Sequence, residues 1–262
     1  MNTAPKTIEQ EIAEAINALL SRGDRFWDWN GVEVTEIRDK ISKLQKVDSR
    51  EAFAQHGALA AICGRPEDLA EFYRKARLLP NKTETDNQFW RCFSNVGQYS
   101  FAHSIGSKLL DPKLGFFPKY WERAVSGGHI REVYENWSAT EKTFPDLNKE
   151  DLGVVRDAAR VMIDRGLSDA DIVAILDLMG EVQREHQIMF SGQHPLILRV
   201  IEESEDPSYL YAVMHIDATI DEVQAMNRKV AALVAQRLGA FPSGLVMSFR
   251  KSVRREQLPV AA

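Results

Sequence analysis

Two segments in which an aromatic residue precedes tryptophan recur in this sequence at a fixed distance. Trp90 and Trp121 lie 31 residues apart, and the glycines that follow them, Gly97 and Gly128, are separated by the same distance. A further step of 33 residues back from Gly97 reaches Gly64, which also lies between two helix-like segments. Self-similarity at this period is typical of stacked helical hairpins, because each hairpin has an apolar face that only a neighbour can cover. The middle of the chain is therefore predicted to be an array of such hairpins.

The helices of this array are predicted from apolar residues that recur every three to four positions. Thr7-Ile8-Glu9-Gln10 has the pattern of a capping box, which places the start of the first helix at residue 7. The aromatic segment 26–31 is predicted to cover the end of the first hairpin, and contact with a ligand or partner is the alternative. The expected helices cover residues 7–22, 33–47, 50–62, 67–79, 86–95, 98–110, 117–126 and 129–141, with two more before residue 190.

A family resemblance is visible in the middle of the array. The segment Val96-Gly97-Gln98-Tyr99-Ser100-Phe101-Ala102 resembles the turn between the two helices of a tetratricopeptide repeat, where a Gly-polar-Tyr step leads to a small residue that packs against the first helix. The resemblance covers residues 49–141 and implies that the first helix of each pair lines a concave groove. The preceding pair is similar to the same consensus through Phe53, Gly57, Gly64, Tyr73, Ala76 and Pro80.

Applied to the second pair, the resemblance places the groove at Asn87, Arg91 and Asn95. Their i, i+4, i+8 spacing puts the three side chains on one stripe of a helix, and all three can form hydrogen bonds. Related repeats use such a stripe to bind carboxylates of a partner. The competing hypothesis is that Arg91 pairs with Glu122, its counterpart 31 residues further on, because surface ion pairs of this kind are common. The sequence therefore predicts a partner-binding groove or, alternatively, an ion pair between repeats.

The apolar pattern changes from a helical to an alternating period after His194. The predicted fold is therefore mostly α with a small α/β C-terminal unit, that is, stacked helical hairpins followed by a β-β-α-β sheet unit. We divide the chain into a helical domain, residues 1–190, and a small α/β domain, residues 191–262. The expected strands cover residues 196–201, 209–216 and 245–249, with a helix over 219–239 between the last two.

One face of the predicted sheet needs a cover, because a single helix covers only one face of a small sheet. An aromatic face that also carries arginine has the composition of a base-stacking platform. More commonly, such a face docks onto another part of the chain or onto a second copy in a homo-oligomer. Leu210, Ala212, Met214 and Ile216 alternate inward, so the candidate contact residues on the other face are Tyr209, Tyr211 and His215 with Val213, joined by Ser248 and Arg250.

The composition of the chain argues against two classes of partner, nucleic acid and the membrane. The chain has 33 Lys and Arg against 38 Asp and Glu, and this acidic balance argues against nucleic acid, whose binding depends on clustered positive charge. No apolar run approaches the roughly 18 residues needed to cross a bilayer, so no membrane insertion is expected. Cys63 and Cys92 both lie in helix-like segments, which predicts reduced thiols in a cytoplasmic protein rather than a disulfide framework.

The sequence lacks the common catalytic and cofactor motifs. It contains no Walker phosphate loop, no dinucleotide-binding glycine pattern, no Gly-x-Ser-x-Gly and no His-Glu-x-x-His, so neither a cofactor nor a metal is expected. The leading hypothesis is a non-enzymatic protein-protein interaction or adaptor protein that binds a protein or peptide in the groove. The alternative is an enzyme or small-ligand sensor with a site between the helical array and the C-terminal sheet, around His194, Tyr211 and His215.

Overall fold

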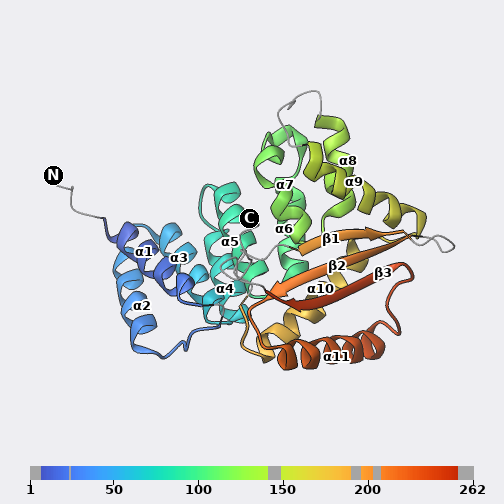
Figure 1. Ribbon diagram of the computed structural model, residues 1–262. Coiled ribbons are helices and arrows are strands. Elements are labelled where there is room, and N and C mark those ends of the chain that lie inside the picture. The colour runs from blue at the N-terminus through green and yellow to red at the C-terminus, as the bar shows by residue number, and fades with distance from the viewer. Residues whose placement is uncertain (1–6, 24, 141–148, 190–195, 203–207, 253–262) are drawn as a thin grey trace, which may run out of the picture.

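The protein is mostly helical, with a small three-stranded sheet near its C-terminus (Figure 1). The computed structural model describes residues 7–23, 25–140, 149–189, 196–202 and 208–252. The α-helices are α1 (Ile8–Ser21), α2 (Val32–Leu44), α3 (Ser49–Ile62), α4 (Pro66–Ala76), α5 (Lys82–Asn95), α6 (Tyr99–Leu109), α7 (Phe117–Ser126), α8 (Ile130–Thr140), α9 (Lys149–Asp164), α10 (Asp169–Glu185) and α11 (Ile220–Arg237), and the strands are β1 (Leu196–Ile201), β2 (Tyr209–Ile216) and β3 (Leu245–Lys251).

The predicted hairpins are present, and local signals in the sequence set their ends. The Thr7 hydroxyl accepts a hydrogen bond from the Gln10 backbone while the Gln10 side chain accepts one from the Thr7 backbone, so the expected capping box begins α1. The three glycines of the repeat, Gly64, Gly97 and Gly128, have φ angles of 65°, 70° and 90°. A left-handed backbone of this kind costs glycine little, so each of them can reverse the chain between two helices.

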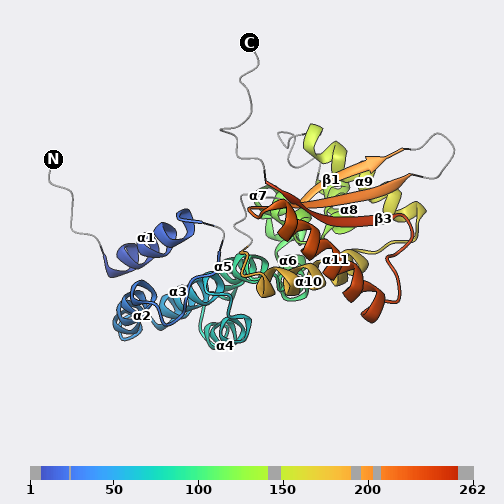
Figure 2. The same ribbon diagram turned by 60° about the horizontal axis from the view of Figure 1, so that its bottom comes forward.

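The hairpins α1–α2, α3–α4 and α5–α6 follow one another from the N-terminal end of the molecule toward the sheet (Figures 1 and 2). Their first helices, α1, α3 and α5, pack side by side. The boundaries differ from those predicted by three or more residues in three places: α2 ends at Leu44, α4 ends at Ala76, and α5 already begins at Lys82. The sequence pattern missed the first turn of α5 because its residues, Lys82 to Glu84, are polar and exposed.

The two repeated tryptophans are buried, as the repeat predicts. Trp90 is 0% exposed and Trp121 is 6% exposed. Trp90 packs against α6 of its own hairpin, because a Cβ atom added at Gly106 would lie 2.9 Å from the indole. The same indole meets the Tyr120 ring of the next hairpin edge-on, with the ring centroids 5.9 Å apart. Trp90 therefore joins its own hairpin to the following one.

The aromatic segment after α1 covers the end of the first hairpins, which confirms the favoured prediction. The Trp27 backbone N–H donates to Ile62 O at 3.0 Å, and the Trp27 indole donates to Leu19 O at 3.3 Å. The Phe26 ring lies against Gly64, and its backbone N–H donates to Gln187 O at 3.1 Å. These contacts connect α1 and α3 with the chain that follows α10.

The sheet has the strand order β1-β2-β3, with β1 antiparallel and β3 parallel to β2. Helix α11 connects the two parallel strands and runs beside β3 (Figure 1). The Asn227 side chain of α11 holds the outer edge of β3, because it accepts from Phe249 N at 2.8 Å and donates to Phe249 O at 3.0 Å. On the inner face of β2, the Tyr99 hydroxyl of α6 donates to Met214 Sδ at 3.8 Å. The inner-face residues of β2 are Leu210, Ala212, Met214 and Ile216, all at most 2% exposed.

One hydrophobic core continues from α3 through the later helices to β3, and a second, smaller core lies among α1, α2 and α3. The predicted boundary at residues 190 and 191, together with His194, lies outside the described residues. The division into two domains therefore stays a prediction. None of the helices in the described part of the chain combines the length and the apolar character that crossing a bilayer requires.

Candidate functional site

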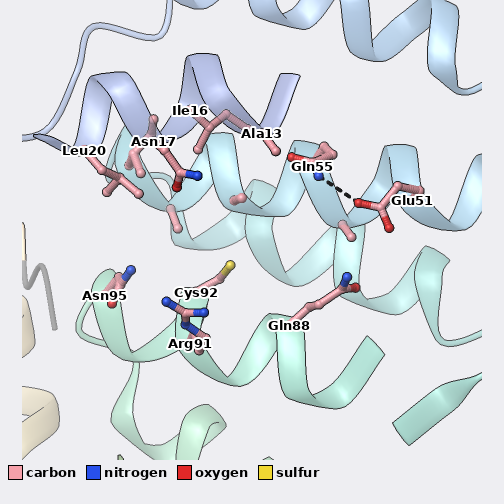
Figure 3. Close-up of a pocket in the computed structure, with 14 residues that line it drawn as sticks. Ala13, Ile16, Asn17, Leu20, Glu51, Gln55, Gln88, Arg91, Cys92 and Asn95 are labelled. Carbon is pink, nitrogen blue, oxygen red and sulfur yellow. Dashed lines mark hydrogen bonds between the residues drawn. The ribbon is translucent and has the colours of Figure 1, made fainter. Parts of the chain in front are cut away.

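A pocket of about 230 Å³ opens between the first helices of the first three hairpins (Figure 3). Helix α3 forms its floor, and α1 and α5 form two facing walls. Each helix contributes residues three or four positions apart, the spacing that places side chains on one face of a helix. The lining residues are Ala13, Ile16, Asn17 and Leu20 from α1, Glu51, Ala54, Gln55, Ala58, Ala61 and Ile62 from α3, and Gln88, Arg91, Cys92 and Asn95 from α5.

The two walls differ in polarity. The wall from α1 is apolar apart from Asn17, whereas the wall from α5 carries two carboxamides and a guanidinium group. Figure 3 shows the Gln88 side chain extending from α5 toward α3, and the Arg91 side chain lying across α5. The Oε1 atom of Gln88 is buried and has no hydrogen-bond partner among the described residues. A buried carbonyl without a partner carries a desolvation cost that a bound donor would remove.

An acidic group lies at one end of the floor. Glu51 is only 7% exposed, and its carboxylate accepts a hydrogen bond of 2.7 Å from the Gln55 side chain. Cys92 also lines the pocket, and burial raises the pKa of its thiol to about 12. The thiol is therefore neutral near pH 7 and serves as a packing group rather than a nucleophile.

Two of the three predicted groove residues, Arg91 and Asn95, line this pocket. The third, Asn87, points toward the next hairpin, where its Oδ1 atom accepts a hydrogen bond of 3.4 Å from Arg123 on α7. The three residues of the predicted stripe therefore do not line one site: two line the pocket, and the third contacts α7. An ion pair between Arg91 and Glu122 stays a prediction.

Arg123 on α7 adds a second positive charge close to Arg91 of the α5 wall. Its guanidinium carbon lies 5.6 Å from the Trp90 ring centroid and 5.7 Å from that of Tyr120. Burial lowers the pKa of Arg123, and the nearby charge of Arg91 lowers it further. The positive charges of Arg91 and Arg123 repel each other. A negatively charged group placed beside both would relieve this repulsion. The pattern within α5 does not indicate Arg123, because this residue belongs to α7 of the next hairpin.

The other predicted contact residues lie on the outer face of the sheet, and none of them lines the pocket. Arg250 Nε donates to the Tyr211 hydroxyl at 3.0 Å, and its guanidinium carbon lies 5.3 Å from the Tyr211 ring centroid. Ser248 Oγ lies 3.1 Å from the same hydroxyl. Tyr209 and His215 stand on this face as well, and both are partly exposed.

Part of this outer face is open, although Val213 in its middle is only 2% exposed. Val246, directly opposite Tyr211 on β3, is 44% exposed, and Arg250 is exposed too. The contact between Tyr99 and Met214 shows that the helical array packs on the inner face instead. The expectation that the array covers the outer face is therefore not met within the described residues. The physical reason is that the helices pack on the opposite face of β2, where the large aliphatic residues of this strand lie. Cover by a second chain stays a prediction.

A partly buried polar cluster that no sequence pattern indicates lies between α6 and α8. His103, His129 and Glu132 bring possible metal-ligand atoms within 4.8 Å of one another. The two imidazole rings are stacked, however, with centroids 3.9 Å apart and an interplanar angle of 18°. Because a ring nitrogen binds a metal along a direction in its own plane, two nearly parallel stacked rings cannot both point at one ion. The arrangement does not fit a metal centre.

The two nitrogens of His129 are already engaged. Nδ1 lies 3.1 Å from Ala124 O, and Nε2 lies 3.0 Å from His103 O. Burial lowers the pKa of His129, as it does for His103. A neutral His129 ring carries a single N–H, so it donates to only one of these two carbonyl oxygens at a time. Its place between them connects α6 and the end of α7 to the start of α8. No short sequence pattern predicts this contact, because His103 and His129 are 26 residues apart in the sequence.

Comparison with known proteins finds no matching family model, no matching curated protein and no matching solved structure. The likeness to tetratricopeptide repeats thus rests on the residues of this chain alone.

Proposed function

We propose that this protein is a non-enzymatic interaction or adaptor protein that binds a peptide segment of a partner protein in the groove formed by α1, α3 and α5. The observation that carries the proposal is the pocket itself, in which Arg91 and Asn95 meet Gln88 beside an apolar wall. Arg91 and Asn95 are two of the three residues at which the resemblance to tetratricopeptide repeats places a partner-binding groove.

The size and chemistry of the pocket support a peptide over a large cofactor. Its volume of about 230 Å³ lies below the roughly 300–1,000 Å³ of sites for drug-sized ligands. Carboxamide side chains such as Gln88 and Asn95 offer both a donor and an acceptor, as a peptide unit does. Arg91 and Arg123 add an attraction for a carboxylate on the partner.

The proposal includes a cytoplasmic location and a second contact surface. Cys63 and Cys92 are both unbridged, which fits a reducing compartment. The outer sheet face around Tyr211 and Arg250 is proposed as the surface for a second contact or for a second copy of the chain, because an apolar patch rimmed by polar groups often marks an interface.

The alternative hypothesis, an enzyme or ligand sensor with a site between array and sheet, gains no support from the described residues. Tyr211 and His215 stand on the face of β2 opposite the one that packs on α6, and His194 lies outside the described residues. We therefore retain the interaction protein as the proposed function.

The proposal is tested by selecting peptides from a display library of random linear peptides on the full-length protein and measuring their affinity for variants. Arg91→Glu should abolish binding and leave the melting temperature nearly unchanged, because Arg91 is exposed on α5. Arg160→Glu, at an exposed position on α9, is the matched control and should bind normally. A melting temperature several degrees lower with intact binding would instead make Arg91 a structural contact between repeats. Failure to select any peptide would contradict the proposed function.

A further inference from the structure

The floor of the pocket is built from small residues. Ala54, Ala58 and Ala61 lie at successive turns of α3, and Ile16 and Leu20 of α1 stand beside them. Larger side chains at these three positions would fill the space, since all three line the pocket. The hollow is therefore apolar at the bottom and along one side.

We propose that this hollow receives one bulky apolar side chain of an extended peptide, and that a backbone N–H beside this side chain donates to Gln88 Oε1. The inference rests on the proposed function and names the feature by which the pocket selects its partner. The apolar side chain supplies affinity because its surface leaves water on binding. The N–H removes the unmet hydrogen-bonding capacity of the buried Gln88 carbonyl, which has no partner among the described residues.

The dimensions favour an extended segment over a helix. The residues of α3 that line the pocket run from Glu51 to Ile62, a rise of about 16 Å at 1.5 Å per residue. A helix about 10 Å in diameter lying in the pocket over that length would need on the order of 1,200 Å³. The pocket has about 230 Å³, enough for a side chain with a short stretch of backbone above it.

The polarity of the two walls indicates which side of the bound peptide is polar. Arg91 and Asn95 lie at the α5 wall, whereas the apolar residues Ile16 and Leu20 form the wall of α1. A peptide with an apolar residue facing α1 and a polar or acidic residue facing α5 therefore meets a complementary group on each side. Such a peptide differs from a purely acidic one, which would use the arginines but leave the alanine floor empty.

The test uses the peptides selected on the full-length protein. In each peptide the bulky apolar residue is replaced by alanine, and the affinity should fall about ten- to hundredfold, the effect of losing one buried large apolar side chain. Ala58→Leu, which fills the floor, should weaken the parent peptide by about tenfold or more and leave the alanine-replaced peptide unchanged. Ala18→Leu, on the exposed side of α1, is the matched control and should change neither affinity.

The hydrogen bond is tested with Gln88→Met, which keeps the length of the side chain and removes the amide. The affinity of the parent peptide should fall about three- to tenfold, and N-methylation of the peptide nitrogen beside the apolar residue should produce a similar loss that is not additive with Gln88→Met. The inference is overturned if selected peptides that depend on Arg91 share no apolar position, or if Ala58→Leu binds them normally. In that case the proposed function stands. If no peptide is selected, the proposed function and the inference both fail.

Discussion

The backbone of Gly180 in α10 touches the backbone of Gly97 in the turn between α5 and α6. A Cβ atom on Gly180 would lie 2.0 Å from the carbonyl oxygen of Gly97, and one on Gly97 would lie 2.5 Å from the Cα atom of Gly180. Arg184, one turn further along α10, donates to Val96 O at 2.7 Å and to Gly97 O at 2.9 Å. This contact fixes α10, which packs on α11 of the sheet unit, to the hairpin that carries the α5 wall of the pocket.

Gly180→Ala should destabilise the protein by about 3 kcal/mol or more, because the methyl group meets rigid backbone, and this clash outweighs the gain of about 1 kcal/mol that alanine brings to a helix interior. The matched control is Gly153→Ala in α9, where a Cβ atom would have no neighbour within 4 Å. That change should stabilise the protein by up to about 1 kcal/mol. Both free energies of unfolding are measured by urea denaturation, and an equal response of the two variants would show that the close contact does not exist in solution.

Trp90→Ala should cost about 3–5 kcal/mol, since the indole is fully buried at the contact between two hairpins. Trp90→Phe should cost clearly less. It keeps most of the apolar volume and removes the indole N–H, which is buried without a hydrogen-bond partner among the described residues. If the two variants proved equally unstable in chemical denaturation, the N–H would have to be satisfied in the native protein.

Stability should fall as the solution becomes acidic. Burial lowers the pKa of His56 from 6.5 to about 4, with Arg38 and Lys75 as smaller causes, and burial lowers the pKa of His103 and His129 as well. The unfolded chain therefore takes up protons below about pH 6.5 that the folded chain does not, and by linkage this favours unfolding. The stability contributed by His56 is complete above pH 6.5 and is lost as the pH falls toward about 4.

The variant His56→Gln tests this assignment. Between pH 7.5 and pH 4.5 the free energy of unfolding should fall in both proteins, but by about 1–2 kcal/mol less in the variant than in the wild type. This difference is smaller than the full shift in the pKa of His56 would give, because the ring is only partly buried. Proton NMR of the His56 ring supplies a direct readout, since its resonances should titrate well below pH 6. A histidine resonance that titrates normally at this position would contradict the prediction.

The outer sheet face should decide the oligomeric state. If a second copy of the chain covers this face, Val246→Asp and Tyr211→Asp should each convert an oligomer into monomers in light scattering, because a carboxylate would be buried in an apolar contact. Val154→Asp, on α9, is the control, since Val154 and Val246 are 47% and 44% exposed. A wild-type protein that is monomeric at high concentration would remove the homo-oligomer from the proposal.

The fold class and most element boundaries follow from patterns that operate within a single element. The capping boxes at Thr7, Ser168 and Thr219 and the left-handed glycines at the hairpin turns depend only on residues a few positions apart. The alternation along β2 also separates buried Leu210, Ala212, Met214 and Ile216 from partly exposed Tyr209, Tyr211 and His215, but it fails at Val213, which is only 2% exposed. For the same reason, Arg91 and Asn95 could be assigned to one helical stripe before the partner helices were known.

The tertiary structure decided what lies opposite each of these faces. The apolar wall of Ile16 and Leu20, the stacking of His103 on His129 and the contact between Gly97 and Gly180 all join residues far apart in the sequence. Periodicity states that a face is buried, because the hydrophobic effect depends on the area removed from water and has no preferred direction. Which element covers that face depends on the fit of surfaces in three dimensions. The sequence therefore determined most of the helices, the turns and two residues of the α5 wall, Arg91 and Asn95, whereas only the packing of α1 and α3 against α5 created the pocket.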